Sequence, residues 1–153
     1  LLFHRTEDEA AEVAEVDLSA DEVTLRTPRR SKSLPVTDVI DEYDVVSEND
    51  FRALKILQPQ RIRQLIADDP ATLIIGILKG YHNQMDRDAL KLQLVPSFIS
   101  PGEWSDWWTK VRGAVRKTPN LRIEGRSPMM LIFGRLIEIL NSSRFNHLSV
   151  TSK

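Results

Sequence analysis

The chain has 153 residues, 41% hydrophobic and 28% charged, which is typical of a soluble globular protein. It has no cysteine, which excludes disulfides and thiolate chemistry, and no apolar run approaches the roughly 18–20 residues that span a bilayer. Residues 1–50 hold fourteen acidic and five basic residues, whereas residues 51–153 hold eight acidic and sixteen basic ones. This asymmetry indicates different partners for the two parts, an acidic arm that screens a basic surface, or a partly disordered arm that keeps the chain soluble.

Residues 1–46 are expected to form an acidic arm with a β-hairpin and a linker. Residues 14–18 and 22–26 alternate apolar and polar side chains around the polar connection Ser19-Ala20-Asp21, a pattern typical of a hairpin. An isolated hairpin is marginally stable in water, so this one must pack on other structure or be part of a barrel. A basic, proline-containing linker covers residues 27–33, and residues 33–36 form a second extended candidate.

Residues 47–140 predict a helical, winged-helix-like domain. Ser47 with Asp50 is the candidate cap of the first helix, and Pro59 opens the second. Asp69-Pro70 caps a helix that is apolar almost all round, so this helix is expected in the core. A short helix over 86–95 follows, capped by Asp86 or Asn83.

The next helix holds all three tryptophans of the chain. Ser100, Pro101 and Glu103 match a capping box, which predicts that this helix begins at residue 101. Trp107 and Trp108 are adjacent and point about 100° apart, so one of them is expected to be partly exposed. Helical spacing places one stripe in the predicted core: Trp104, Trp107, Trp108, Val111 and Val115.

Two strands are predicted after the tryptophan helix, over 121–124 and 129–133, then a helix over 136–140 and a polar tail over 141–153. Three short helices followed by a hairpin is the order of a winged helix-turn-helix, whose third helix faces a DNA groove. Alternatively, the cations are only a solvated helix face, or the domain binds protein. The candidate nucleic-acid or partner contacts are Lys110, Arg112, Arg116, Lys117, Arg122 and Arg126.

Catalytic chemistry has no support in the residue pattern. His4, His82 and His147 lie in three separate segments without metal-ligand spacing, and the six glycines form no phosphate-binding loop. Helix caps and solvated linkers explain the acidic pairs. We therefore expect no catalytic residue, no metal site, no cofactor and no small-molecule substrate, and the chain is not expected to be an enzyme.

Several stretches of the sequence resemble a known family. They are the hairpin, the Asp-Phe-x-Ala-Leu-Lys segment at 50–55, Asp69-Pro70 with its apolar helix, and the stretch 103–119. Together they resemble the N-terminal extension of the long GreA/GreB-type transcription elongation factors of some bacteria. In that family a W-x-x-W-W-x-x-x-(K/R) helix ends in a Lys-x-Pro-like stop, which residues 104–119 match. The resemblance covers roughly residues 12–133, and the tryptophan helix is its only specific motif.

The resemblance implies an association with RNA polymerase and a bacterial cytoplasm. It does not imply transcript cleavage. In that family cleavage depends on acidic residues at the tip of a long coiled-coil hairpin, which help hold a metal in the polymerase active site, and this sequence has no long heptad hairpin.

The sequence thus predicts a mainly α, α+β fold with a small β-hairpin arm and a winged-helix-like bundle. The predicted function is a non-enzymatic interaction module of a bacterial transcription elongation factor, docking on RNA polymerase or its nucleic acid through a basic helix face. The alternatives are a protein-only structural scaffold and a stand-alone winged-helix protein that binds duplex DNA.

Overall fold

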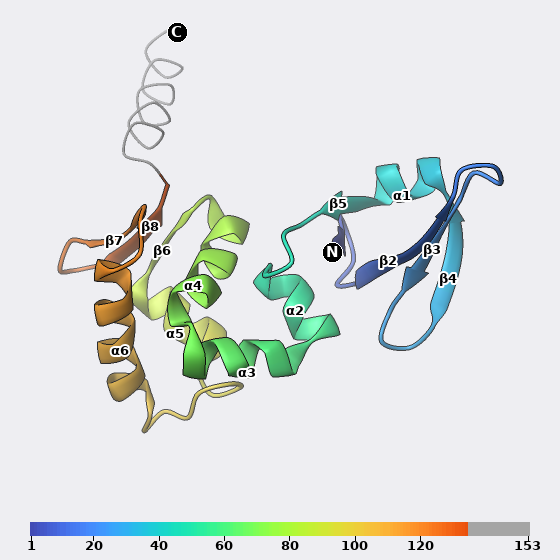
Figure 1. Ribbon diagram of the computed structural model, residues 1–153. Coiled ribbons are helices and arrows are strands. Elements are labelled where there is room, and N and C mark those ends of the chain that lie inside the picture. Colours follow the sequence, from blue (N-terminus) through green and yellow to red (C-terminus); the bar gives the residue numbers. More distant parts are fainter. Residues whose placement is uncertain (135–153) are drawn as a thin grey trace, which may run out of the picture. The chain divides into compact units, whose positions relative to one another are not determined.

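The computed structural model describes residues 1–134 of the chain. Contacts divide these residues into two compact units, unit 1 from Leu1 to Gly80 and unit 2 from Tyr81 onward (Figure 1). The described part is an α+β structure with six α-helices and two antiparallel sheets. None of its helices combines the length and the apolar character that crossing a membrane requires.

Unit 1 begins with a five-stranded antiparallel sheet in the order β4-β3-β2-β1-β5. The predicted hairpin is confirmed, because Val16 pairs with Val23 across two of these strands. The two three-residue strands of this sheet were not predicted, since three residues are too short to show alternation. The strands are β1 (Leu2–His4), β2 (Ala10–Asp17), β3 (Glu22–Arg26), β4 (Ser31–Pro35) and β5 (Tyr43–Val45).

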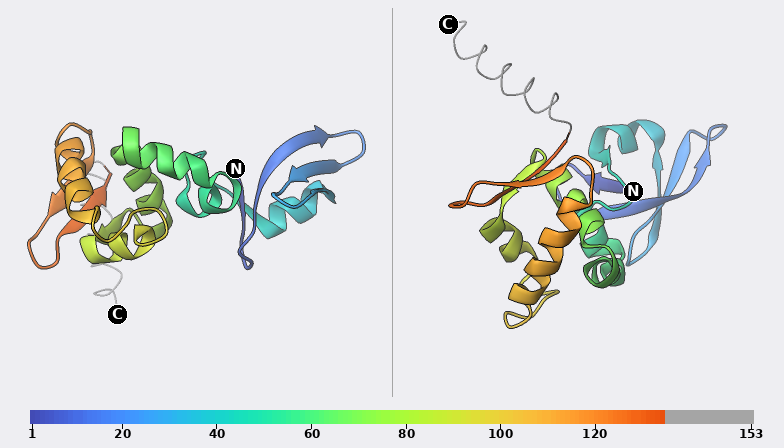
Figure 2. Two further views of the ribbon diagram at one scale, coloured as in Figure 1. Left: turned by 90° about the horizontal axis from the view of Figure 1, so that it is seen from below. Right: turned by 60° about the vertical axis from the view of Figure 1, so that its left-hand side comes forward.

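The sheet has a small hydrophobic core of its own. Leu2, Val23, Leu25 and Tyr43 are buried in it together with Ala11. Helix α1 (Val36–Glu42), which the sequence did not predict, lies beside β3 and β4 (Figure 2) and adds partly buried valines to this core. An ordered sheet covered by a helix thus takes the place of the hairpin arm and linker that the sequence predicts.

Three further helices complete unit 1: α2 (Phe51–Leu57), α3 (Pro59–Asp68) and α4 (Pro70–Leu78), followed by a single 3₁₀ turn, Lys79–Tyr81. Asp50, and not Ser47, caps α2, because its carboxylate accepts from the Ala53 N–H at 3.1 Å. Asp69 caps α4 as predicted, accepting from Thr72 N–H at 3.3 Å, and α4 is buried on most sides.

The first unit includes these helices as well as the sheet. Helix α2 contacts β1 and β2, and the Gln58 side chain donates to Glu12 Oε1 at 2.9 Å. The contacts therefore divide the described chain after Gly80, whereas the sequence-based boundary lies between residues 46 and 47.

Unit 2 contains a three-stranded antiparallel sheet in the order β6-β8-β7 and two helices. The predicted hairpin is confirmed by the pairing of Ile123 with Leu131, and a third strand joins it where Met85 also pairs with Leu131. The elements are β6 (Gln84–Asp86), α5 (Arg87–Leu94), α6 (Trp104–Arg116), β7 (Leu121–Glu124) and β8 (Met130–Phe133).

The predicted start of the tryptophan helix is wrong by three residues. Helix α6 begins at Trp104, and no side chain caps it. The backbone carbonyl of Ser100 accepts from the Glu103 N–H at 3.0 Å, so residues 100–103 form a turn and the capping box does not form. The predicted helix over 136–140 and the polar tail over 141–153 lie outside the described residues.

Candidate functional site

The tryptophan stripe fixes which face of α6 is exposed. Trp104, Trp107 and Trp108 are each 7% exposed, and Val111 is fully buried. The ring of Trp104 lies 5.5 Å from that of Trp107 and 5.9 Å from that of Trp108, between centroids. Both adjacent tryptophans are therefore buried, and the expectation that one of them is partly exposed is wrong.

The opposite face of α6 carries the predicted cations. Lys110, Arg112, Arg116 and Lys117 are all exposed, and they lie in the second half of the helix or at its end. Cations at this end are favourable because the helix dipole places partial negative charge on the last carbonyl groups. Because the tryptophans of α6 are buried, these four positively charged side chains are exposed to solvent.

The β7–β8 hairpin supplies the other two predicted cations, and they lie in different environments. Arg122 Nη1 pairs with Glu124 Oε1 at 3.0 Å, so its charge is compensated within the same strand. Arg126 is exposed in the turn. Gly125 shapes this turn: its φ is +79°, and a Cβ there would lie 2.7 Å from the backbone oxygen of Pro128.

Helix α6 and the hairpin line an open pocket of about 320 Å³, which we call the arginine pocket. Arg112 and Arg116, one helical turn apart, line it together with Arg126. Its apolar lining is Val115, which is buried, and Ile123 and Met129, which are half-buried. In the part of the chain that the structure describes, none of the three guanidinium groups has a carboxylate partner.

The structure therefore brings together three of the six predicted contact residues. Lys110, Lys117 and Arg122 do not line the pocket. The apolar lining residues Ile123 and Met129 were not predicted as site residues, because alternation along a strand indicates a buried or exposed face but not which helix lies over it.

Charge changes sign along α6. Glu103 precedes the helix and Asp106 lies in its first turn, whereas the arginines lie in the last two turns. In helix-turn-helix proteins that read DNA, the N-terminal residues of the recognition helix contact the base edges. The acidic start of α6 is unfavourable for that role, because its carboxylates would enter a groove flanked by negatively charged phosphates.

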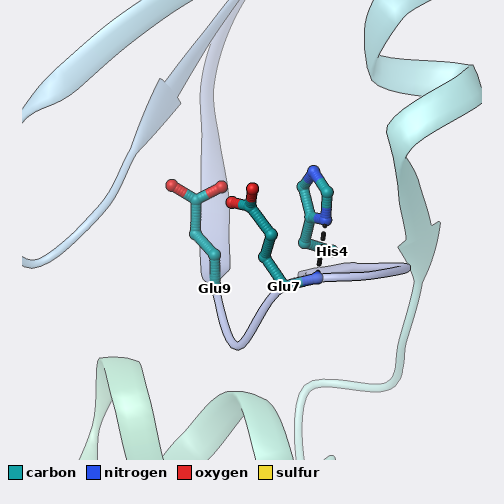
Figure 3. Close-up of side chains that lie close together, drawn as sticks. All are labelled: His4, Glu7 and Glu9. Carbon is teal, nitrogen blue, oxygen red and sulfur yellow. Dashed lines mark hydrogen bonds between the residues drawn. The ribbon is translucent and has the colours of Figure 1, made fainter.

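A second cluster lies in unit 1, at the loop between β1 and β2. Figure 3 shows the side chains of His4, Glu7 and Glu9 on the same side of this loop, and their potential metal-ligating atoms lie within 4.8 Å of one another. The sequence predicts no metal site, since it places the histidines in separate segments. The loop brings one of them close to two glutamates.

Two of the three candidate ligands in this cluster, His4 and Glu9, already have hydrogen-bond partners. His4 Nδ1 accepts from the backbone N–H groups of Thr6, at 3.2 Å, and Glu7, at 3.0 Å, so the proton of the neutral ring lies on Nε2. Both Glu9 oxygens accept from Lys32 Nζ at 3.0 Å. A metal ion would have to displace these donors, so the cluster is better explained as a hydrogen-bonded corner of the sheet.

Titration of Glu9 reflects the same contacts. Burial raises the pKa of its carboxyl group, but hydrogen bonds from Tyr43 and Lys32 outweigh burial and hold the pKa below the ordinary value of 4.5. Burial and the hydrogen bond to Glu9 raise the pKa of Tyr43. The carboxylate is therefore held ionised by its neighbours, which is the protonation state that supports the sheet.

Comparison with known proteins places the chain in a family. Residues 52–135 match the GRAD helix-turn-helix domain. A protein of Treponema pallidum (strain Nichols) described as a "GreA-associated domains protein" is 28% identical over 91 residues, which are 59% of this chain and 14% of that relative. No solved structure matches the chain. These matches confirm the resemblance to GreA-associated sequences, and since the family match covers more than half of the residues, the chain belongs to the GRAD helix-turn-helix domain family.

Proposed function

We propose that this chain is a non-enzymatic interaction module of a bacterial transcription elongation factor, which docks on RNA polymerase or its nucleic acid. The observation that supports this most directly is the gathering of Arg112, Arg116 and Arg126 around one pocket without carboxylate partners in the described chain. The name of the Treponema relative connects such domains with GreA, and a bacterial cytoplasm is the compartment in which this function would take place.

A winged-helix arrangement is part of the proposal. Within unit 2 the chain order β6, α5, α6 and the β7–β8 hairpin agrees with it, and so does the sheet order β6-β8-β7. In this arrangement α6 is the helix that is offered to a partner, with the β7–β8 hairpin as the wing beside it.

The chemistry of the arginine pocket supports a binding role. Its side chains are guanidinium groups and apolar groups. Neither type serves as a nucleophile or as a general base at neutral pH. Binding a negatively charged partner is the function that such a lining performs well.

The test is capture of purified bacterial RNA polymerase core by the full chain, beside a fluorescence titration of duplex DNA at low and high salt. Replacing Arg112, Arg116 and Arg126 together by Gln should leave the far-UV circular dichroism spectrum unchanged and abolish capture. Replacing Lys91 by Gln, at an exposed position of α5 outside the pocket, is the control and should leave capture intact.

Capture of the polymerase without measurable DNA affinity would support docking on protein. Salt-sensitive DNA binding without capture would instead favour a winged-helix DNA reader, because released counterions make such binding fall steeply with salt. Capture that is unchanged in the triple variant would refute the role of the basic face.

A further inference from the structure

The arginine pocket differs from a simple phosphate-binding surface in its apolar lining. Val115, Ile123 and Met129 line it together with the three arginines. A phosphate contact requires cations and N–H donors but no apolar surface. Apolar surface in a pocket contributes binding free energy only when the ligand brings an apolar group to cover it. The ligand that uses the whole lining is therefore both anionic and apolar.

Nucleobases could supply the apolar part, but the aromatic residues are in the wrong place for them. Proteins that bind single strands stack the bases on exposed aromatic side chains. The three tryptophans are buried under α6, and no aromatic side chain from the described residues lines the pocket. The acidic first turn of α6, with Asp106, also opposes insertion of the helix into a duplex groove.

Carboxylates fit the other half of the lining. All three cations are arginine, whose planar guanidinium group binds a carboxylate through two parallel hydrogen bonds. Their exposure leaves them accessible to an incoming chain. A volume of about 320 Å³ is at the lower end of the range for ligand sites, which suits the side chain of a peptide better than a large cofactor.

We infer that the arginine pocket binds an acidic peptide segment of a partner protein, with one apolar side chain of the segment against Val115, Ile123 and Met129 and flanking Asp or Glu side chains on the arginines. This inference rests on the proposed function and specifies the chemistry of the docking surface. It places the partner contact on protein and not on nucleic acid.

A selection experiment tests the ligand class directly, because it requires no identified partner. The full chain is immobilised and a library of random twelve-residue peptides displayed on phage is selected against it. The enriched peptides should combine several Asp or Glu residues with a Leu, Ile, Met or Phe. Enrichment of peptides without acidic residues, or no enrichment, would overturn the inference.

Matched variants then locate the binding site. Fluorescence anisotropy of one enriched peptide should show at least about fivefold weaker binding to Arg126→Glu, because reversing an exposed charge turns attraction into repulsion. Lys91→Glu changes the net charge equally, outside the pocket, and should leave the affinity within about twofold. Met129→Gln keeps the side-chain length, removes apolar surface and should weaken binding severalfold. Equal affinity for Arg126→Glu and Lys91→Glu would refute the pocket as the site.

Competition separates the two classes of partner. A twelve-base-pair duplex DNA should not displace the peptide at physiological salt, and displacement by it would assign the pocket to nucleic acid. The proposed function can fail independently of this inference. Peptide binding at the pocket without polymerase capture would support the inference and exclude RNA polymerase as the partner. Polymerase capture that is unaffected by Arg126→Glu would support docking on the polymerase and refute the arginine pocket as the docking site.

Discussion

Replacing Trp108 by Ala tests whether the tryptophan stripe holds α6 in unit 2. The side chain is 7% exposed and stacks on Trp104 with an interplanar angle of 20°. A buried tryptophan removes about 150–250 Å² from water, which at about 25 cal/mol per Å² corresponds to about 4–6 kcal/mol. Because the unfolded chain already buries part of this area, we expect the free energy of unfolding to fall by about 3–5 kcal/mol.

Hydrogen exchange is the appropriate measurement, because two compact units can unfold separately and one global free energy would then be undefined. The loss should appear in the most protected amides of α6. Thr109→Ala is the control: Thr109 is exposed, its hydroxyl donates to the Ser105 carbonyl at 3.1 Å, and its removal should change stability by about 0.5 kcal/mol or less. A cost below about 1 kcal/mol for Trp108→Ala would show that the side chain is not a core residue.

Four further substitutions test the backbone and the pH dependence. Gly125→Ala places a Cβ at positive φ against a backbone oxygen, and should destabilise the hairpin by about 1–3 kcal/mol and weaken peptide binding. Gly113→Ala, with open space around it, should stabilise α6 by about 0.5–1 kcal/mol. Hydrogen exchange of the hairpin and α6 amides compares the two variants. Gly76→Ala would make its Cβ overlap with the carbonyl oxygen of Asn49, so α4 must shift, and hydrogen exchange should show a loss of about 1–3 kcal/mol or more in the most protected amides of α4. Because the pKa of Glu9 is lowered in the folded state, its carboxylate stabilises the fold above about pH 4.5, and this contribution is lost as the pH falls further. Glu9→Gln should therefore lose less stability in acid than the unchanged chain does. The same dependence of stability on pH in both proteins would contradict the assigned role of the carboxylate.

The candidate site was partly accessible from the sequence. Helical spacing identified the inner stripe of α6 and so the outer position of Arg112 and Arg116. It could not show that Arg122 is paired with Glu124 two residues away, since that depends on the side-chain conformations. Nor could it show that the turn brings Arg126 next to the same helix, because this contact depends on how the hairpin packs against α6.

Local patterns by themselves determined the elements whose residues are neighbours in sequence. The β2–β3 hairpin, the aspartate caps at Asp69 and Asp86, and the buried stripe of α6 all depend on spacings of a few residues, where propensity and periodicity act. The family resemblance came from the same source, since it rested on the tryptophan spacing and on the order of the elements.

Tertiary structure alone decided the features that join distant residues. Strands β1 and β5 exist because Leu2 pairs with both Ala11 and Val45, and no local pattern in three residues encodes such pairing. Residues 100–103 also form a backbone turn, although their sequence matches a capping box. The arginine pocket belongs to this class: its charges come from α6 and from a turn, and only the packing of a helix on a hairpin makes them one site.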